Sequence, residues 1–551
     1  MFLSPARVLI VVTALCAALL LLPVTLPIGA NYWDLFLHVD GAYRVSLGQV
    51  PHVDFFTPAG ALPFYALAGV RYVFPDAHPL LAGQYAFGIA ALLLIVIVLR
   101  GHKVLALAVL VPVAVFVLLP FNAISFFPAP GVDAIGLYNR QAGFLLTALV
   151  TALVFGRQDL CRDLVIAVAL AALLFTKFNG FAGGILCLGV ATVSGAMRMR
   201  SWLIVTVIIA SLVGVLQIYN GLPLAYLADL RAMMQHNSGH AFARLATQLS
   251  VKIDVILPLL LLIGLLFWQD RPWRDRPWQN RTWQAGSIGL IQSPAAQLAG
   301  YSLAMVLYES QNTGSQEYLA LWPVLLLLLR NALVRPQSGM RFATLGLIAA
   351  VCLPTAVAVV QAAMRAGVGA FTYVSVPDRL LDRLGRVSAK AEYQTRAAAM
   401  LTQYRDFRGS YDALAEAHEV PGTLLYSTPD YQLLYLADIR SAIDLVAANE
   451  VATGRVYKQL YTLDYVDVIP FLTGRTPVRG VTVSFDPGRG YPLSEHARMN
   501  EALQGVDGIL VPHCPETPAR KAIAFAALPS LTSREKISLS PCWDLYRTSS
   551  P

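Results

Sequence analysis

Three aspartates, Asp34, Asp40 and Asp54, lie in residues 31–65, a segment rich in Tyr, Phe, Trp, Gly and Pro. The segment directly follows an apolar run, residues 8–30, that is long enough to cross a bilayer. A carboxylate at a membrane interface can act as a general base, bind a metal or accept hydrogen bonds from sugar hydroxyls. The alternative is a solvated loop in which Asp34 caps a short helix.

The composition is that of a membrane protein with many spans. The chain has 551 residues, of which 56% are hydrophobic and 13% are charged, whereas a soluble domain carries about 25% charged residues. The net charge is +8, but the basic residues cluster in short loops between apolar runs, which indicates membrane orientation rather than nucleic-acid binding. Because no small-residue cleavage site follows the first run, we expect a retained helix and not a signal peptide.

The apolar runs predict about eleven crossings, several of them shorter than the ~20 residues that a bilayer needs. The predicted crossings are 8–30, 80–99, 104–119, 141–155, 164–175, 181–196, 202–218, 255–268, 286–308, 318–329 and 342–363. With a cytoplasmic N-terminus, the loops rich in Arg and Lys all fall inside, as the positive-inside rule requires. We therefore predict a multi-pass protein of the inner or plasma membrane with its C-terminal tail outside. Residues 60–74 are apolar enough to lie in the interface, and residues 219–254 read as a long polar loop.

The tail changes character, since its charges are spread throughout and its apolar runs are short. We predict a membrane domain, residues 1–364, followed by an extracytoplasmic α/β domain, residues 365–551, that is long enough for its own core. The tail is predicted to contain a helix at 377–408 and strands at 423–426, 466–471, 481–485 and 508–511. Its two cysteines, Cys514 and Cys542, form a disulfide in an oxidising compartment or stay as buried thiols, and the sequence leaves both open.

The segment DGAYRVSLGQVPHVDFFTPAGALPFY resembles the first outer loop of the polyprenyl-phosphate-sugar-dependent glycosyltransferases of the C superfamily (GT-C). Protein O-mannosyltransferases and lipid A aminoarabinose transferases belong to this superfamily. The residues that match its pattern are Asp40, Tyr43, Gly48, Pro51, Asp54, Pro58 and Gly60. Two positions depart from it, because Gly41 replaces the second acid of a pair and His52 replaces a tyrosine.

The resemblance implies a helical membrane fold with an outer C-terminal domain, Asp40 as the catalytic carboxylate and Asp54 as a supporting acid. The missing second acid leaves the metal requirement open, so no cofactor is assigned, although a divalent metal is compatible with the loop. His236 and His240 are spaced for a metal on a helix, but no third ligand is evident.

Further polar residues at the predicted outer face suit a lipid-phosphate sugar donor. Arg140 and Lys177 are expected to bind the donor phosphate, unless they only extend toward the lipid headgroups. The residues expected to bind the sugar or the acceptor, several of them in the polar loop 309–317, are Tyr43, Asn139, Asn179, Glu309, Gln311, Asn312 and Glu317. An ordinary solvated turn is the alternative for that loop.

Together these features predict an inverting membrane glycosyltransferase with Asp40 as general base. It would move a sugar from a polyprenyl-phosphate carrier to an outer-face glycan, lipid or protein hydroxyl in the cell envelope. The absence of a Walker loop and of a dinucleotide fingerprint argues against a nucleotide-sugar donor. The alternatives are a transporter or flippase of lipid-linked glycans, a non-catalytic assembly protein, and a polymerase or ligase that uses a diphosphate-linked donor.

Overall fold

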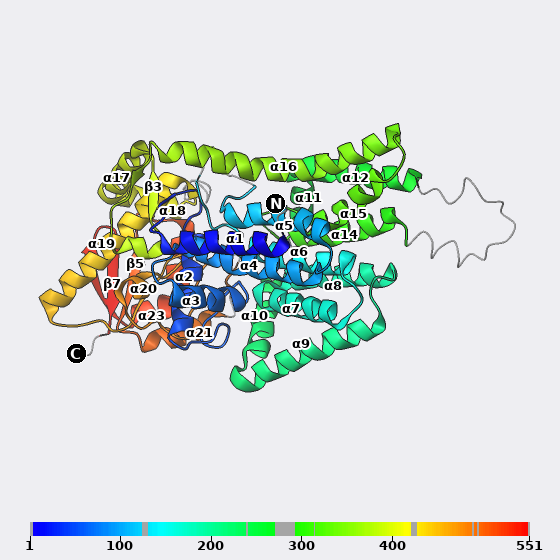
Figure 1. Ribbon diagram of the computed structural model, residues 1–551. Coiled ribbons are helices and arrows are strands. Elements are labelled where there is room, and N and C mark those ends of the chain that lie inside the picture. Colours follow the sequence, from blue (N-terminus) through cyan, green and yellow to red (C-terminus); the bar gives the residue numbers. More distant parts are fainter. Residues whose placement is uncertain are drawn as a thin grey trace.

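The computed structural model of the protein (Figure 1) describes residues 4–123, 131–237, 241–269, 292–312, 314–419, 427–487, 490–492 and 495–548. The N-terminal elements are α1 (Pro5–Leu21), β1 (Leu26–Pro27), α2 (Asp34–Ser46), α3 (Leu62–Val73), α4 (Pro79–Val98), α5 (Lys103–Leu118), α6 (Leu137–Phe155), α7 (Leu160–Thr176), α8 (Phe178–Val193), α9 (Met199–Asn220), α10 (Leu222–Asn237), α11 (Ala241–Val251), α12 (Ile253–Gln269), α14 (Pro294–Glu309), η2 (Leu319–Leu321), α15 (Trp322–Leu333) and α16 (Gly339–Ala370). The tail adds β2 (Val374–Ser375), η3 (Leu381–Leu384), β3 (Val387–Ala389), α17 (Ala391–Asp406), α18 (Arg408–Glu416), α19 (Pro429–Thr453), β4 (Leu460–Thr462), α20 (Ile469–Thr473), α21 (His496–Gln504), β5 (Gly508–Pro512), α22 (Pro518–Ala526), α23 (Leu528–Thr532), β6 (Glu535–Ser540) and β7 (Trp543–Arg547).

Apolar helices make up the part of the molecule that is predicted to lie in the membrane. Among the described residues, α4, α9 and α16 are each long and apolar enough to cross a bilayer, and the pair α11–α12, bent by 88°, would add a fourth span. Shorter apolar helices, such as α1 and α5, pack beside them in one bundle (Figure 1). The chain is therefore a mostly helical membrane protein, while the number of eleven crossings stays a prediction.

Two predictions in this half are wrong, namely the end of the first helix and the polar loop at residues 219–254. The first helix ends at Leu21 and not at residue 30, because Pro23 and Pro27 cannot continue it. The predicted polar loop 219–254 instead contains α10 and α11. The side chains of His236 and His240, and the first residues of the predicted span 286–308, lie outside the described residues.

The tail is α/β, with one four-stranded sheet in the order β4-β5-β7-β6. Strand β5 occupies the predicted strand 508–511, and it pairs parallel to β4 and antiparallel to β7. Residues 466–471 were predicted as a strand but lead into α20, which Pro470 starts well because its missing N–H costs nothing in a first turn. The predicted helix 377–408 begins only at Ala391, since η3 and β3 precede it.

Other tail predictions have mixed outcomes. Residues 481–485 form an isolated bridge to Phe56 rather than a strand, and the predicted strand 423–426 lies outside the described residues. Cys514 and Cys542 are joined in a disulfide.

The tail packs directly against the segment between α1 and α3. Strand β1 pairs in parallel with β3, Leu26 opposite Val387, and the backbone N–H of Phe56 donates to the carbonyl of Val481 at 2.9 Å. Buried side chains of α2 and of α19 belong to one hydrophobic cluster. In Figure 1 the tail elements accordingly gather at one end of the helical bundle, around α2 and α3.

Candidate functional site

The candidate site is a cavity of about 990 Å³ between the helical bundle and the tail. Its walls come from α2, the segment before α6, the α7–α8 junction, α10, α11, the loop after α14, and the tail. A volume of this size suits a small organic ligand. Because α10 and α11 supply part of the wall, the stretch predicted as a polar loop is part of the site.

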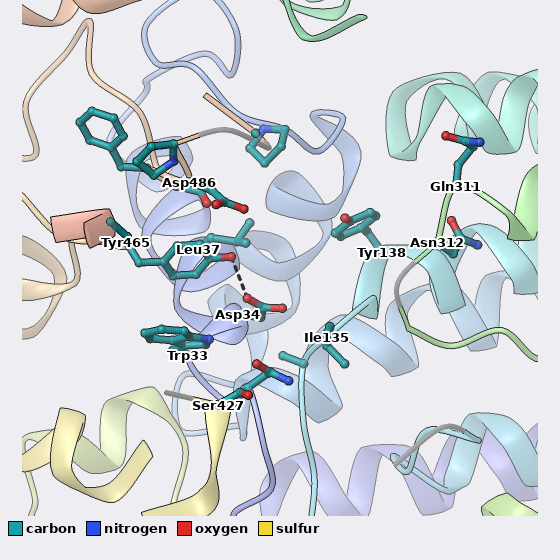
Figure 2. A pocket seen from close by; sticks show the side chains of 18 of the residues that line it. Trp33, Asp34, Leu37, Ile135, Tyr138, Gln311, Asn312, Ser427, Tyr465 and Asp486 are labelled. Carbon is teal, nitrogen blue, oxygen red and sulfur yellow. Dashed lines mark hydrogen bonds between the residues drawn. The ribbon is translucent and has the colours of Figure 1, made fainter. Parts of the chain in front are cut away.

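One end of the cavity carries the carboxylates of Asp34, Asp464 and Asp486 together with Arg520, whose guanidinium is paired with Asp464. Asp34 lies in the first turn of α2, where the helix dipole favours a carboxylate. The hydroxyl of Tyr465 donates a hydrogen bond to Asp34 Oδ1 at 2.7 Å, and Asp486 lines the same end (Figure 2). Burial raises the pKa of Tyr465 well above its usual range, and the negative charges of Asp34 and Asp486 add to this effect. Tyr465 therefore stays protonated and holds the carboxylate of Asp34 in place.

The other end of the cavity is cationic and rich in amides. Lys177, at the junction of α7 and α8, donates hydrogen bonds to the side-chain oxygens of Asn139 and Asn312. Its ammonium also lies 4.8 Å from the ring centre of Tyr138. Arg244 of α11 lines the cavity nearby, with its Nη1 3.5 Å from Oε1 of Gln311. The hydrogen-bond partners of Lys177 are neutral amides, while the carboxylate of Glu309, which does not line the cavity, also acts on its charge.

Asp40, the predicted catalytic carboxylate, does not line this cavity. It is completely buried and accepts a 2.8 Å hydrogen bond from Arg44 Nε, one turn later on α2. Arg44 also donates to the carbonyl of Val478 in the tail. Asp467 is buried close by; burial raises the pKa of its carboxyl to about 8, and the charge of Asp40 contributes to this shift. Asp40 is thus paired with Arg44 away from the cavity, and its assignment as general base stays a prediction.

Arg140, predicted to bind phosphate, is also committed elsewhere. Its guanidinium forms a buried ion pair with Glu317, and its Nε lies 3.1 Å from Glu317 Oε1. It donates further hydrogen bonds to Gln84 and to the carbonyl of Leu119. Neither Arg140 nor Glu317 lines the cavity. This pair joins α6 to the loop after α14, and a phosphate role for Arg140 stays a prediction.

The remaining predicted residues divide into two groups. Lys177, Gln311 and Asn312 line the cavity, and their roles in binding stay predictions. The others bond to the surrounding structure. Tyr43 donates a hydrogen bond to the carbonyl of Arg475, and Asp54 accepts one from Arg479. Asn139 donates to the carbonyl of Gly314, and Glu309 accepts from Asn312. Asn179 does not line the cavity.

Sequence reasoning left four residues of the cavity without an assigned role. Asp34 was one of three candidate carboxylates, with a helix cap as the alternative, and Arg244 fell in the stretch predicted as a loop. Tyr465 and Asp486 come from the tail, more than 400 residues after Asp34, and no sequence pattern connects them. An aspartate next to a tryptophan, Trp33, was the one available signal. Among the described residues, no group of three or more His, Cys, Asp or Glu side chains could hold a metal ion.

Comparisons with known proteins give structural likenesses only. No protein-family model matches the chain, and no curated protein matches it. The chain is similar to ArnT from Cupriavidus metallidurans, in the apo state (12% identity, TM-score 0.37, 98% of this chain and 97% of that chain) and bound to undecaprenyl phosphate (13%, 0.42, 98% and 97%). It is also similar to the Archaeoglobus fulgidus oligosaccharyltransferase tethered with an acceptor peptide (13%, 0.34, 97% and 72%). At these identities and TM-scores the likenesses carry no argument about chemistry.

Proposed function

We propose that this chain is an inverting membrane glycosyltransferase that takes a sugar from a polyprenyl-phosphate carrier and passes it to a hydroxyl of a cell-envelope acceptor. The observation that carries the proposal is the charge distribution of the cavity. A carboxylate held by a tyrosine, Asp34 with Tyr465, lies at one end. Two cationic side chains, Lys177 and Arg244, line the other end.

Glycosyl transfer needs a carboxylate at one end of the cavity and cationic side chains at the other. Asp34 accepts the proton of the acceptor hydroxyl as its oxygen bonds to the anomeric carbon. The bond between that carbon and the phosphate oxygen breaks, and its electron pair leaves with the phosphate. Lys177 and Arg244 stabilise the negative charge that develops there. A single displacement with the acceptor and the phosphate on opposite sides inverts the anomeric centre.

The orientation of the chain agrees with this proposal. If the N-terminus is cytoplasmic, the basic loops stay inside and the cavity opens on the outer face. A lipid-linked donor would then approach through the bilayer and an acceptor from outside. The helices α10 and α11 supply apolar side chains to the cavity, among them Met233 and Val251, on which a lipid carrier could pack.

The test is the turnover of a panel of radiolabelled polyprenyl-phosphate sugars by the purified chain in lipid nanodiscs. We expect Asp34→Asn to bind the donor that wild type consumes and to turn it over about 100- to 10,000-fold more slowly. Lys177→Met is expected to weaken donor binding. An Asp34→Asn protein with wild-type turnover would refute the base assignment.

Asp40→Asn is the matched control for the acid. Because Asp40 is buried against Arg44, its loss is expected to lower stability more than the turnover of the protein that remains folded. If no donor of the panel binds to wild type, the transferase proposal fails, and the transporter and assembly alternatives remain.

A further inference from the structure

The acidic end of the cavity has an aromatic wall, of which the proposed transfer step uses only Tyr465, the residue that holds Asp34. Trp33, Tyr431, Tyr465 and Phe485 all line the cavity. The ring of Trp33 lies 5.0 Å from that of Tyr465 with a tilt of 35°, and 5.6 Å from that of Tyr431, edge to face. The backbone N–H of Trp33 donates to Gln432 Oε1 at 2.8 Å. These contacts fix Trp33 before any ligand binds.

Hydrogen-bonding groups surround this wall. Asp34 and Asp486 contribute carboxylates, and Ser427 contributes a hydroxyl group (Figure 2). Ser484 also lines the cavity. A carboxylate accepts several hydrogen bonds at once, so it binds ligands that carry neighbouring hydroxyls. A sugar ring presents such hydroxyls at its edge and apolar C–H groups on its face, and these C–H groups pack on an aromatic ring.

The backbone around the cavity is unsuited to an extended peptide. None of the lining residues belongs to strands β1 to β7 of the described structure, so no strand edge is offered for the added-strand mode by which many domains bind peptides. The lining at this end is mostly polar and aromatic, and the aliphatic side chain of Leu37 lies beside Asp34 and Asp486 (Figure 2).

We infer that the acceptor is a carbohydrate, bound with one sugar ring on Trp33 and its hydroxyls on Asp34 and Asp486. This inference rests on the proposed function, because it names the class of acceptor at the same site. Asp486 is assigned to binding and not to proton transfer. The donor phosphate lies at the other end, with Lys177 and Arg244.

The test separates saccharide binding from donor consumption. Mono- and disaccharides of hexoses, pentoses and amino sugars, and serine- and threonine-containing peptides of similar size, are titrated onto the full chain in nanodiscs without donor. We expect at least one saccharide to bind and no peptide to bind. Trp33→Leu is expected to weaken saccharide binding by about tenfold or more while donor binding stays unchanged. Trp268→Leu is the control, since Trp268 is 57% exposed on α12 and does not line the cavity.

The outcomes distinguish this inference from the proposed function. Saccharide binding that depends on Trp33, without consumption of any donor, supports the sugar site and refutes the transferase. Donor turnover with a peptide as acceptor supports the transferase and overturns the carbohydrate acceptor. The inference is equally overturned if no saccharide binds, or if Trp33→Leu binds saccharides as wild type does. Asp486→Asn gives a second test should Trp33→Leu fail to fold.

Discussion

Gly41 stands at the position of the second acid in the resembled family pattern, and the packing of α3 leaves no space there for a side chain. A Cβ atom on Gly41 would lie 2.4 Å from Cδ1 of Phe64, which packs on α2 from α3. We expect Gly41→Ala to destabilise the protein by about 1–3 kcal/mol through overpacking. Gly69→Ala is the control, because nothing lies within 4 Å of its Cβ position and alanine favours a helix. Thermal unfolding in detergent compares the two, and equal stability would contradict the packing argument.

A second prediction at this scale concerns the buried pair of Arg140 and Glu317. Glu317→Gln keeps the shape of the side chain but leaves the guanidinium buried without its counter-ion. The expected loss is about 3–5 kcal/mol of folding free energy. The exposed pair of Arg100 and Asp159 provides the control, since Asp159→Asn breaks an ion pair that is 60% and 40% exposed and should cost less than about 1 kcal/mol. If both variants unfold at the same temperature, the pair of Arg140 is not the stabilising contact that we describe.

The residue types of the candidate site could be predicted from the sequence, but which aspartate of α2 lines the cavity could not. An acid in the first loop and Lys177 at a break between spans were both recognised as candidates. Asp34 and Asp40 are six residues apart on α2, and at about 100° per residue they face different sides of the helix. Which side meets the cavity depends on where the tail packs, and that information is absent from the local sequence.

At the scale of elements, the largest error is the prediction of a polar loop at residues 219–254, and helical periodicity would have corrected it. Leu222, Tyr226, Asp229 and Met233 are spaced four, three and four residues apart, which places them on one face of α10. The first three are buried, and Met233 lines the cavity. The charges of the stretch favoured a loop in our prediction, whereas the 3.6-residue period was the stronger signal.

The ends of β5 and β7 hold a charged group that should make the tail sensitive to pH. His513 Nδ1 lies 2.7 Å from Glu516, and its Nε2 lies 2.7 Å from Asp544. Both contacts are hydrogen bonds only when the imidazole carries both protons. Burial alone would lower the pKa of His513, but the hydrogen bonds to Asp544 and Glu516 outweigh it and raise the pKa. For Asp544, burial is outweighed by the hydrogen bonds from His513 and Lys536, which lower its pKa from 3.8 to about 2.

Folding raises the pKa of His513 and lowers the pKa of Asp544, so the two groups lose their stabilisation in opposite directions of pH. The stabilisation from His513 is complete below its unfolded pKa and is lost as pH rises through its higher folded pKa. The stabilisation from Asp544 is present above pH 3.8 and is lost as pH falls toward about 2. We expect unfolding midpoints of wild type to exceed those of His513→Asn most at mildly acidic pH and to approach them at alkaline pH. A difference that grows with rising pH would contradict a protonated His513.

At the scale of the whole molecule, the division into a membrane domain and an independent tail is the prediction most affected by the packing. Trp33 bonds to Gln432, Asp54 bonds to Arg479 at 2.9 Å, and β1 pairs with β3. These contacts join residues more than 350 positions apart. Composition and hydropathy report only local character, so they located the change near residue 365 but not the packing of one part on the other.

We therefore predict that the tail does not fold alone. Phe36 of α2 stacks on Tyr435 of α19 with ring centres 6.2 Å apart, and the buried cluster around them contains side chains from both parts. Residues 365–551 expressed alone would expose the tail's share of this cluster, and loss of such contacts costs several kcal/mol for each large side chain. We expect a fragment that binds a hydrophobic dye and lacks cooperative unfolding, and that becomes soluble when residues 1–364 are co-expressed. A monodisperse tail fragment with a sharp unfolding transition would instead show that the tail has a sufficient core of its own, and that α2 only docks on a finished surface.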